Sequence, residues 1–389
     1  MKKNLRIFAA TMMAFVMTIA MTACGTEPST SREEPTTVVS NTTESSVKEE
    51  TVTQEPVTEE PVAQETETQE PSTTETPALT GPVEFNIVSV GGMYFDETIV
   101  NEAKAAGGYD YLFTDVKPYV EDADVAIGVI QTPINTKEGF DIAYAIANAG
   151  FDVINVATTN VADNGENDLN ATIGQPHTNG MQVCGVESQV NPWGKIAYVD
   201  VKGVKVAFIA GAEGATSEEG RYDINTIDED LIISQIEEAK SNGAMAIVVS
   251  LNFADNGQTS LEQDKIDLFN HLGSAGANLV LCSGLDRTIV AGGAMDAANG
   301  IYGKFVSYQG CFVASTTEMA ALFRINVRID ETGYVDVLSY TTEGKVLYIN
   351  SADHYRLVPV SADDAANGDY TDEFKAFANS FYGQYNEIN

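Results

Sequence analysis

Cysteine is scarce in this chain of 389 residues, which contains four of them. Cys24 lies near the N-terminus, and the other three are Cys184, Cys282 and Cys311. Because an odd number remains after Cys24, at most one disulfide can form among them, which excludes a disulfide-stapled scaffold. Buried thiols in ordinary packing are favoured over a disulfide or a reactive thiolate.

Histidine and tryptophan are also rare. The three histidines, His177, His271 and His354, show no spacing typical of metal ligands. No Ser/His/Asp or Cys/His arrangement is visible, so a site built on a histidine base is not indicated. His177 lies in GQPHTNG, which we interpret as a loop, and the single tryptophan, Trp193, fits a packing role as well as a stacking platform for a sugar.

Basic residues are outnumbered by acidic ones, 21 to 57, for a net charge of −36. Residues 83–389 hold 16 of the basic and 44 of the acidic residues, for a net charge of −28. A domain this acidic repels phosphate backbones, so nucleic acid is excluded as a partner. It would also repel anionic polymers of the cell wall.

The N-terminal 24 residues have the pattern of a secretory signal. Three basic residues precede an apolar run from Ile7 to about Ala20, and small residues follow before Cys24. This arrangement resembles a bacterial lipobox. The resemblance implies cleavage before Cys24 and a diacylglyceryl group on its sulfur, which would anchor the protein to the extracytoplasmic face of the cell membrane. The alternative is an ordinary signal peptide with an incidental cysteine.

Residues 25–82 lack aromatic residues altogether. They are almost entirely Thr, Glu, Pro, Ser, Val and Gln, and carry 13 glutamates against Arg32 and Lys48. Such a segment has too little apolar surface to offset its conformational entropy, so we expect a disordered stalk. Proline and like charges would extend it beyond the roughly 40 Å expected of a random coil of this length.

Residues 83–389 alternate between strand and helix patterns. We expect strands at 84–90, 124–130, 151–157, 204–210, 244–251, 277–284, 304–312, 321–330 and 334–340, the last two paired antiparallel. Helices are expected at 139–150, 228–243, 261–276 and 371–385. Continuous apolar strands indicate sheets covered on both faces, hence a layered α/β domain with mixed sheets. We place this domain at 83–345, with a C-terminal extension at 346–389.

Several strand ends, in this order, resemble the CapA-type family of poly-gamma-glutamate capsule-synthesis proteins, relatives of the calcineurin-like metallophosphoesterases. The segments that carry the resemblance are VGG (90–92), ADVAIGVIQTPI (123–134), AIANAGFDVINVATTNVADNG (145–165), VVSLNFADNG (248–257), SAGANLVLCSGLDRT (274–288) and SYQGCF (307–312). The resemblance implies a four-layer αββα sandwich and a pair of metal ions at the strand ends.

The positions that would bind those metals have changed in this chain. Gly92 stands for an Asp of the family. Val129 and Gln131 stand for an Asn and a Glu, Thr159 and Asn160 for an Asn and a His, and Asn252 for a His. Gly284 and Asp286 stand for a final pair of histidines. Only Asp286 carries charge, and amides and hydroxyls bind Zn, Mn or Fe weakly. We therefore expect no metal, no cofactor and no catalytic residue at these positions.

We instead expect Thr158, Thr159 and Asn160 to cap the strand end and to hydrogen-bond neighbouring loops, with Asp163 and Gly165 serving a turn. Three functions remain open. The first is a non-catalytic CapA-like protein that binds or scaffolds a cell-wall or capsule component. The second is an active metal-dependent hydrolase or ligase of capsule polyglutamate with unusual ligands. The third is a solute-binding lipoprotein, which would have two hinged lobes. The sequence favours the first and gives no indication of the oligomeric state.

Overall fold

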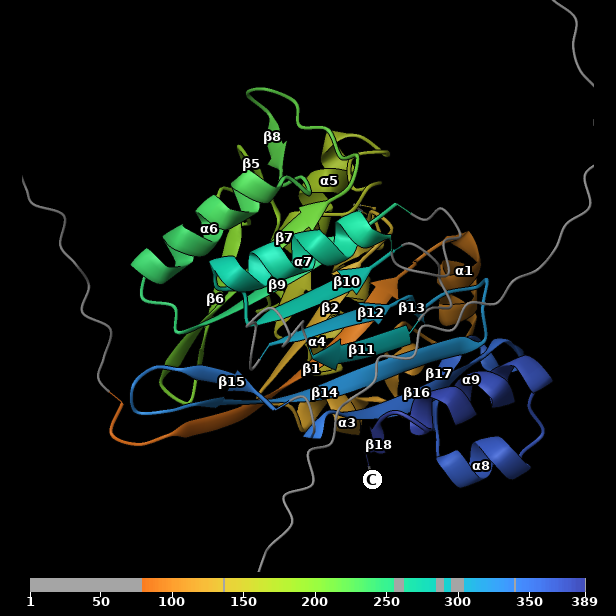
Figure 1. The fold of residues 1–389 in the computed structure, drawn as a ribbon. Helices are drawn as coiled ribbons and strands as arrows, with labels where there is room; N and C mark the ends of the chain where they lie inside the picture. The colour runs from red at the N-terminus through yellow and green to blue at the C-terminus, as the bar shows by residue number, and fades with distance from the viewer. Residues whose placement is uncertain are drawn as a thin grey trace, which may run out of the picture. The chain divides into compact units, whose positions relative to one another are not determined.

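The computed structural model describes residues 79–135, 137–254, 262–284, 290–294, 304–338 and 341–388. The predicted signal, Cys24, residues 25–78 of the predicted stalk and Asp286 lie outside these ranges. The described residues form two large sheets, one of ten strands and one of six, and a two-stranded sheet (Figure 1). Both large sheets mix parallel and antiparallel pairs, as predicted.

The first sheet is centred on β1 (Val83–Met93), which pairs in parallel with β2 and antiparallel with β14. Its strand order is β17 (Arg356–Val360), β16 (Glu343–Asn350), β14 (Met319–Ile329), β1, β2 (Val125–Ile130), β3 (Val153–Asn155) and β4 (Gln182–Cys184). Three short strands lie off this path. They are β13 (Cys311–Val313), which pairs with β1, β15 (Val335–Val337), which pairs with β14, and β18 (Asn386–Glu387), which pairs with β16. The predicted antiparallel pairing of the segments around 321–330 and 334–340 is confirmed by β14 and β15.

The second sheet contains the other long apolar strands. Its order is β11 (Val290–Ala294), β12 (Phe305–Gln309), β10 (Leu279–Ser283), β9 (Ala246–Asn252), β7 (Val204–Ala212) and β6 (Ile196–Val201). The small third sheet pairs β5 (Val186–Ser188) with β8 (Tyr222–Ile224).

Alternation along the strands of the second sheet places its side chains in two separate cores. In β7, Phe208 belongs to the large core that the two sheets share, whereas Ile209 belongs to a smaller outer core. In β9, Val248 and Val249 divide in the same way. Successive side chains of a strand point to opposite faces, so a strand that is apolar throughout is covered on both.

Helices cover the outer faces. The outer core of the second sheet is closed by α6 (Glu229–Ser241) and α7 (Gln263–Ala275), which lie side by side in Figure 1. Buried side chains of α1 (Glu97–Ala105), α2 (Asp110–Phe113), α3 (Lys117–Glu121), α4 (Gly139–Asn148) and α5 (Glu166–Thr178) belong to the large core with the first sheet. The predicted helices at 139–150, 228–243 and 261–276 are confirmed, and so is the four-layer αββα arrangement.

The segment predicted as one strand at 304–312 is two strands in different sheets. β12 ends at Gln309, and β13 begins at Cys311 beside β1 in the other sheet. The chain crosses at Gly310, whose carbonyl accepts a hydrogen bond from the amide of Gly92 at 2.9 Å. A side chain on the adjacent Gly91 would meet this carbonyl oxygen at 2.5 Å, so the crossing requires glycine there.

The C-terminal residues contribute to the first sheet and its core. The boundary expected at residue 346 falls inside β16. The 3-10 turn Ser351–Asp353, α8 (Ala362–Asn367) and α9 (Asp372–Tyr382) follow, and Phe374 and Phe381 of α9 are buried in the large core. Among the described residues, no helix has the length and apolar character needed to cross a membrane.

Candidate functional site

The carboxyl ends of strands from both large sheets meet at one cavity. In the first sheet, Gly92 at the end of β1 lies opposite Val129 of β2, and Gln131 follows β2 directly. In the second sheet, Asn252 ends β9 opposite Ser283 of β10. The cavity has a volume of about 510 Å³ and is lined by Tyr94, Asp96, Gln131, Thr132, Pro133, Thr159, Asn160, Asp163, Asn164 and Ala254. The carboxyl ends of strands are where α/β sheets bind ligands.

Two buried amide side chains join the sheets beside this cavity. Asn252 Nδ2 donates to Gln131 Oε1 at 2.6 Å, and Gln131 Nε2 donates back to Asn252 Oδ1 at 3.2 Å. Asn252 is fully buried and Gln131 is 8% exposed. Asn252 also donates to Ser283 Oγ at 2.9 Å and accepts from the backbone amide of Thr159 at 3.2 Å. The side-chain oxygen and nitrogen of each amide are therefore bonded to protein, and Gln131 also lines the cavity.

Thr158, Thr159 and Asn160 take three different roles after β3. The Thr159 hydroxyl donates to the backbone carbonyl of Glu213 at 3.1 Å, as expected of a residue that bonds a neighbouring loop. Thr158 is fully buried and its hydroxyl has no hydrogen-bond partner. Asn160 is exposed at the cavity, and its carbonyl accepts from the amide of Asp163 at 3.1 Å. Only Thr159 thus makes the side-chain bond to a neighbouring loop that was expected.

Glu213 is the carboxylate that sequence reasoning missed. It follows β7 directly, and its Oε2 accepts from the amide of Ala254 at 2.9 Å. Its own amide donates to the carbonyl of Asn252 at 2.8 Å. An acidic residue immediately after a buried apolar strand was the available signal. Its carboxylate therefore holds the backbone at Ala254, two residues after the end of β9.

The strand ends do not fit a pair of metal ions. A side chain on Gly284, where the family resemblance implies a ligand, would place its Cβ 1.8 Å from the carbonyl oxygen of Phe253. A Cβ on Gly92 would lie 2.9 Å from the Tyr94 ring. Within the described ranges, no group of three or more His, Cys, Asp or Glu side chains could hold a metal. Gln131 and Asn252, which bond to each other, supply only neutral amides where a metal pair needs anionic oxygens or imidazoles.

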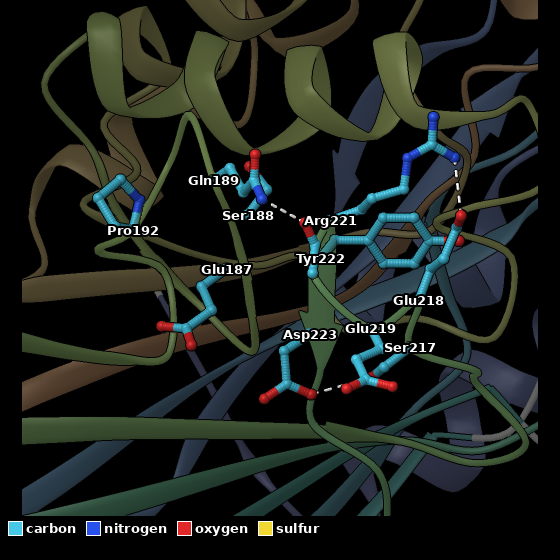
Figure 2. A pocket seen from close by; sticks show the side chains of 11 residues that line it. Glu187, Ser188, Gln189, Pro192, Ser217, Glu218, Glu219, Arg221, Tyr222 and Asp223 are labelled. Carbon is cyan, nitrogen blue, oxygen red and sulfur yellow. Dashed lines mark hydrogen bonds and ion pairs between the residues drawn. The ribbon is translucent and has the colours of Figure 1, made fainter. Parts of the chain in front are cut away.

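A second cavity, of about 450 Å³, lies beside the β5–β8 pair (Figure 2). Its carboxylates are largely engaged by two cations. Arg221 lies 2.8 Å from Glu218 and 3.0 Å from Glu166, and Lys195 pairs with Asp223 and Glu187. The Lys195 hydrogen bond lowers the pKa of Asp223.

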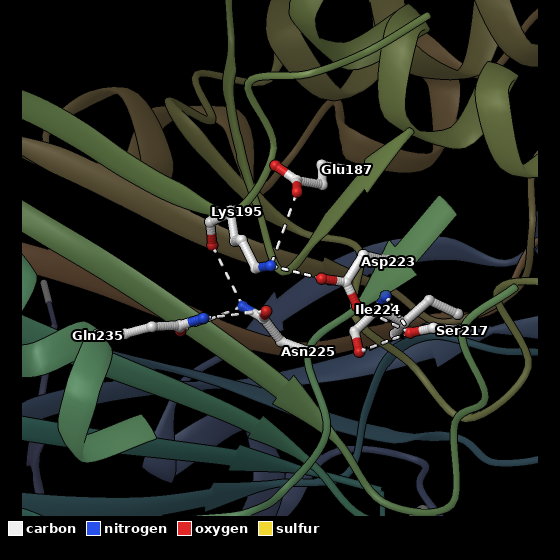
Figure 3. Close-up of polar contacts among 7 residues, drawn as sticks. All are labelled: Glu187, Lys195, Ser217, Asp223, Ile224, Asn225 and Gln235. Atoms are coloured by element: carbon white, nitrogen blue, oxygen red, sulfur yellow. Dashed lines mark hydrogen bonds and ion pairs between the residues drawn. The ribbon is translucent and has the colours of Figure 1, made fainter. Parts of the chain in front are cut away.

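A buried polar contact holds this region against α6. Asn225 and Gln235 exchange two hydrogen bonds, Gln235 Nε2 to Asn225 Oδ1 at 3.0 Å and Asn225 Nδ2 to Gln235 Oε1 at 3.2 Å (Figure 3). Ser217 accepts from the amide of Ile224 at 2.8 Å. These contacts and the ion pairs fasten the loop at 213–221 to its surroundings, which is a structural role.

The remaining candidates from the sequence are structural. No disulfide joins Cys184, Cys282 and Cys311, and all three are buried. Burial raises the pKa of the Cys184 and Cys282 thiols, which makes them unreactive. The prediction of a loop around His177 is wrong, because His177 lies in the last turn of α5. The centroids of the His177 and Trp193 rings are 4.5 Å apart.

A family model described as "Bacterial capsule synthesis protein PGA_cap" matches residues 86–284, which include every substituted position named above except Asp286. The capsule biosynthesis protein CapA of Bacillus anthracis is 24% identical over an alignment of 291 residues, and the match covers 67% of this chain and 69% of the relative.

Two solved structures are also similar. The protein TT1561 of Thermus thermophilus aligns with a TM-score of 0.37 and 8% identity over 66% of this chain and 99% of its own. The 5'-nucleotidase from Candida albicans aligns with a TM-score of 0.41 and 9% identity over 77% of this chain and 57% of its own.

Proposed function

Because the chain belongs to the bacterial capsule synthesis protein family PGA_cap, we propose that it is a non-catalytic member that binds or scaffolds a component of the capsule or cell wall. One observation carries the proposal. The side chains of Gln131 and Asn252, at positions where the family resemblance implies metal ligands, bond to each other across the two sheets.

This amide pair supports a structural role for the former metal-binding strand ends. A two-metal site must offset four positive charges with anionic oxygens and neutral imidazoles. Gln131, Asn252 and Thr159 offer neither, and their hydrogen bonds already satisfy one another. The amide pair would give the two sheets a link that does not require metal.

The shared core of the two sheets argues against a solute receptor. Such receptors bind between two lobes that move about a hinge. Here Val88 of the first sheet and Phe208 of the second belong to one continuous buried cluster. A rigid scaffold with a surface for binding agrees better with this packing than a pair of hinged lobes.

We propose that the protein is anchored at the extracytoplasmic face of the cell membrane through lipid on Cys24. The support is the signal pattern of residues 1–24 and the acidic, proline-containing segment at 25–82, which would hold the domain away from the membrane. Metabolic labelling with an alkyne fatty acid tests this. Label on the native chain that is absent from Cys24→Ala supports the anchor, and equal labelling of both contradicts it.

The net charge of residues 83–389 limits the choice of polymer. At −28, this domain would repel a polyanion such as polyglutamate unless counterions screened the repulsion. The capsule or wall component is therefore proposed to be one without strong negative charge.

A phosphodiesterase assay tests whether the protein is catalytic. The full-length chain is assayed with bis(p-nitrophenyl) phosphate in the presence of Mn²⁺, Zn²⁺ or Fe²⁺, beside the variant Asp286→Ala. We expect no turnover above the free metal ions for either protein. Turnover by the native chain that Asp286→Ala abolishes would overturn the proposal and favour an active metal-dependent enzyme.

A further inference from the structure

Two aromatic side chains are exposed on one surface of α4. Phe140 is 52% exposed and Tyr144 is 50% exposed. They lie four residues apart on the helix, so they share a face. Their ring centroids are 6.5 Å apart and their planes differ by 18°, which makes a stacked pair. Adjacent exposed aromatic rings are a common mark of a binding surface.

A polar cavity of about 450 Å³ opens beside the Tyr144 ring. It is lined by Lys104, Gly107, Gly108, Tyr109, Asp110, Glu138, Asp141 and Tyr144. Gly107 and Gly108 have φ values of 100° and 141°, and no atom lies within 4 Å of the place where a Cβ would sit on either. Their backbone is therefore open to a ligand at close range.

The floor of this cavity offers both donors and acceptors. Glu138 Oε1 accepts from Lys104 Nζ at 2.6 Å, and Glu138 Oε2 accepts from the Tyr109 hydroxyl at 3.4 Å. The hydrogen bond from Lys104 lowers the pKa of Glu138, and burial raises the pKa of Tyr109. The cavity thus offers the Glu138 carboxylate as an acceptor and the amino group of Lys104 and the hydroxyl of Tyr109 as donors, with the exposed Asp141 beside them.

We infer that this surface, which we call the α4 site (Phe140, Tyr144 and the cavity lined by Lys104, Tyr109, Glu138 and Asp141), binds an uncharged saccharide. A pyranose ring has an apolar face of C–H groups and an edge of hydroxyls. The first suits the Phe140–Tyr144 platform, and the second suits a floor that both donates and accepts hydrogen bonds.

Charged ligands fit the α4 site less well. Three carboxylates, on Asp110, Glu138 and Asp141, line the cavity. Lys104 and Lys137 both pair with Glu138, so the carboxylates still outnumber the ammonium groups, which disfavours an anion. For a cation, Lys104 Nζ already takes up the Glu138 carboxylate at 2.6 Å. The nearly parallel rings of Phe140 and Tyr144 form a stacked pair and do not enclose a cation on several sides.

The α4 site is separate from the cavity at the strand ends, so it goes beyond the proposed function. Gln131 lines the strand-end cavity, whereas Glu138 lines the α4 site, and no lining residue is shared between the two. The proposed lack of catalysis and saccharide binding can therefore fail independently. A chain that binds metal and turns over substrate could still bind sugar through Tyr144.

Isothermal titration calorimetry tests the inference. The full-length chain is purified in a detergent without a sugar headgroup and titrated with cellohexaose and chitotetraose as uncharged probes. Poly-gamma-glutamate and spermidine serve as anionic and cationic probes. We expect binding of at least one uncharged probe, and a loss of about fivefold in affinity in Tyr144→Ser, since an aromatic contact contributes about 1 kcal/mol.

A matched control separates this loss from a general effect of removing a tyrosine. Tyr334, at the turn between β14 and β15, is 53% exposed, so Tyr334→Ser makes the same change on another surface. It should bind as the native chain does. Asp141→Asn, an exposed change that keeps the size of the side chain, should weaken binding less than Tyr144→Ser. Circular dichroism establishes that each variant is folded.

The inference is overturned by any of three results. The first is no binding of either uncharged probe at millimolar concentration. The second is sugar binding that Tyr144→Ser leaves unchanged. The third is a preference of the Tyr144 surface for spermidine or polyglutamate over both sugars.

Discussion

The strand interiors and the strand ends of this domain are held by different kinds of interaction. In the interiors, side chains such as Phe208 and Val248 fill a core that the two sheets share, and their neighbours Ile209 and Val249 fill a second core under helices. At the ends, Gln131 and Asn252 satisfy each other through hydrogen bonds. The interiors are held by burial, and the ends by a small polar network.

The difference shows how a scaffold can persist when its ligands change. Burial is non-directional and spread over many residues, so the framework does not depend on a metal. A metal site depends on a few donors placed to within fractions of an ångström. At Gly92, Asn252 and Gly284, where the family resemblance implies metal ligands, this chain has no anionic or imidazole donor. Under the proposal, the cores would persist without metal, and the amide pair would link the two sheets.

A single substitution in a strand interior should lower the free energy of unfolding most. Phe208 is fully buried between the two sheets. Phe208→Ala removes a ring from this core and leaves a cavity, so we expect the free energy of unfolding to fall by about 3–5 kcal/mol. Urea unfolding followed by circular dichroism measures it. A loss below about 1 kcal/mol would mean that the sheets are not closely packed there.

Among the strand ends, Gly284 should be the position at which a substitution lowers stability most. Gly284 and Gly203 share a φ of +83°, but only at Gly284 would a Cβ meet backbone, at 1.8 Å from Phe253 O, whereas Gly203 has open space. Gly203→Ala should therefore cost about 1 kcal/mol of conformational strain. Gly284→Ala adds a backbone collision and should cost about 2–3 kcal/mol more.

The free energies of unfolding of the two glycine variants are measured by urea unfolding in the same way. Equal losses for Gly284→Ala and Gly203→Ala would show that the strand end has room for a side chain. The steric argument against a ligand at position 284 would then fail.

Substitutions in the amide pair should lower the free energy of unfolding by less. Asn252→Ala leaves buried polar groups of Gln131, Ser283 and Thr159 without a partner, so we expect a loss of about 1–3 kcal/mol in the free energy of unfolding. A double-mutant cycle with Gln131→Ala should give a coupling energy of about 1 kcal/mol between the two amides. Additive losses would show that the two side chains do not act as a cross-link between the sheets.

The smallest effect on stability is expected at the exposed aromatic pair. Tyr144→Ser changes a half-exposed side chain outside both cores, so the free energy of unfolding should change by less than about 0.5 kcal/mol. Thermal unfolding measures it. A larger loss would assign Tyr144 to the framework and would weaken its use as a binding probe.

The sequence predicts the framework well because burial leaves a regular pattern. The strands at 204–210 and 244–251 and the helix at 228–243 correspond to β7, β9 and α6 within a few residues. Helix α5 was missed because Gly174 and Pro176 interrupt its pattern, although Thr172 and Ile173 are buried. Strands β4 and β5 have three residues each, too few for a period to show.

The candidate site was predicted only as a set of positions. Sequence identifies Gln131 and Asn252 as replacements, but their reciprocal hydrogen bonds join residues 121 positions apart. The contact of Thr159 with Glu213 depends likewise on how the two sheets pack. The split at Gly310, where one apolar run serves two sheets, has no signal in hydrophobicity and follows from the pairing of β13 with β1 in the other sheet.

Metal content tests the central claim most directly. The full-length chain is dialysed against micromolar Mn²⁺, Zn²⁺ and Fe²⁺ in turn, separated from free ions, and measured by inductively coupled plasma mass spectrometry. The amide pair and the blocked position at Gly284 predict far less than one bound ion per chain for every metal. A stoichiometric pair of ions, lost in Asn252→Ala or Asp286→Ala, would contradict the account.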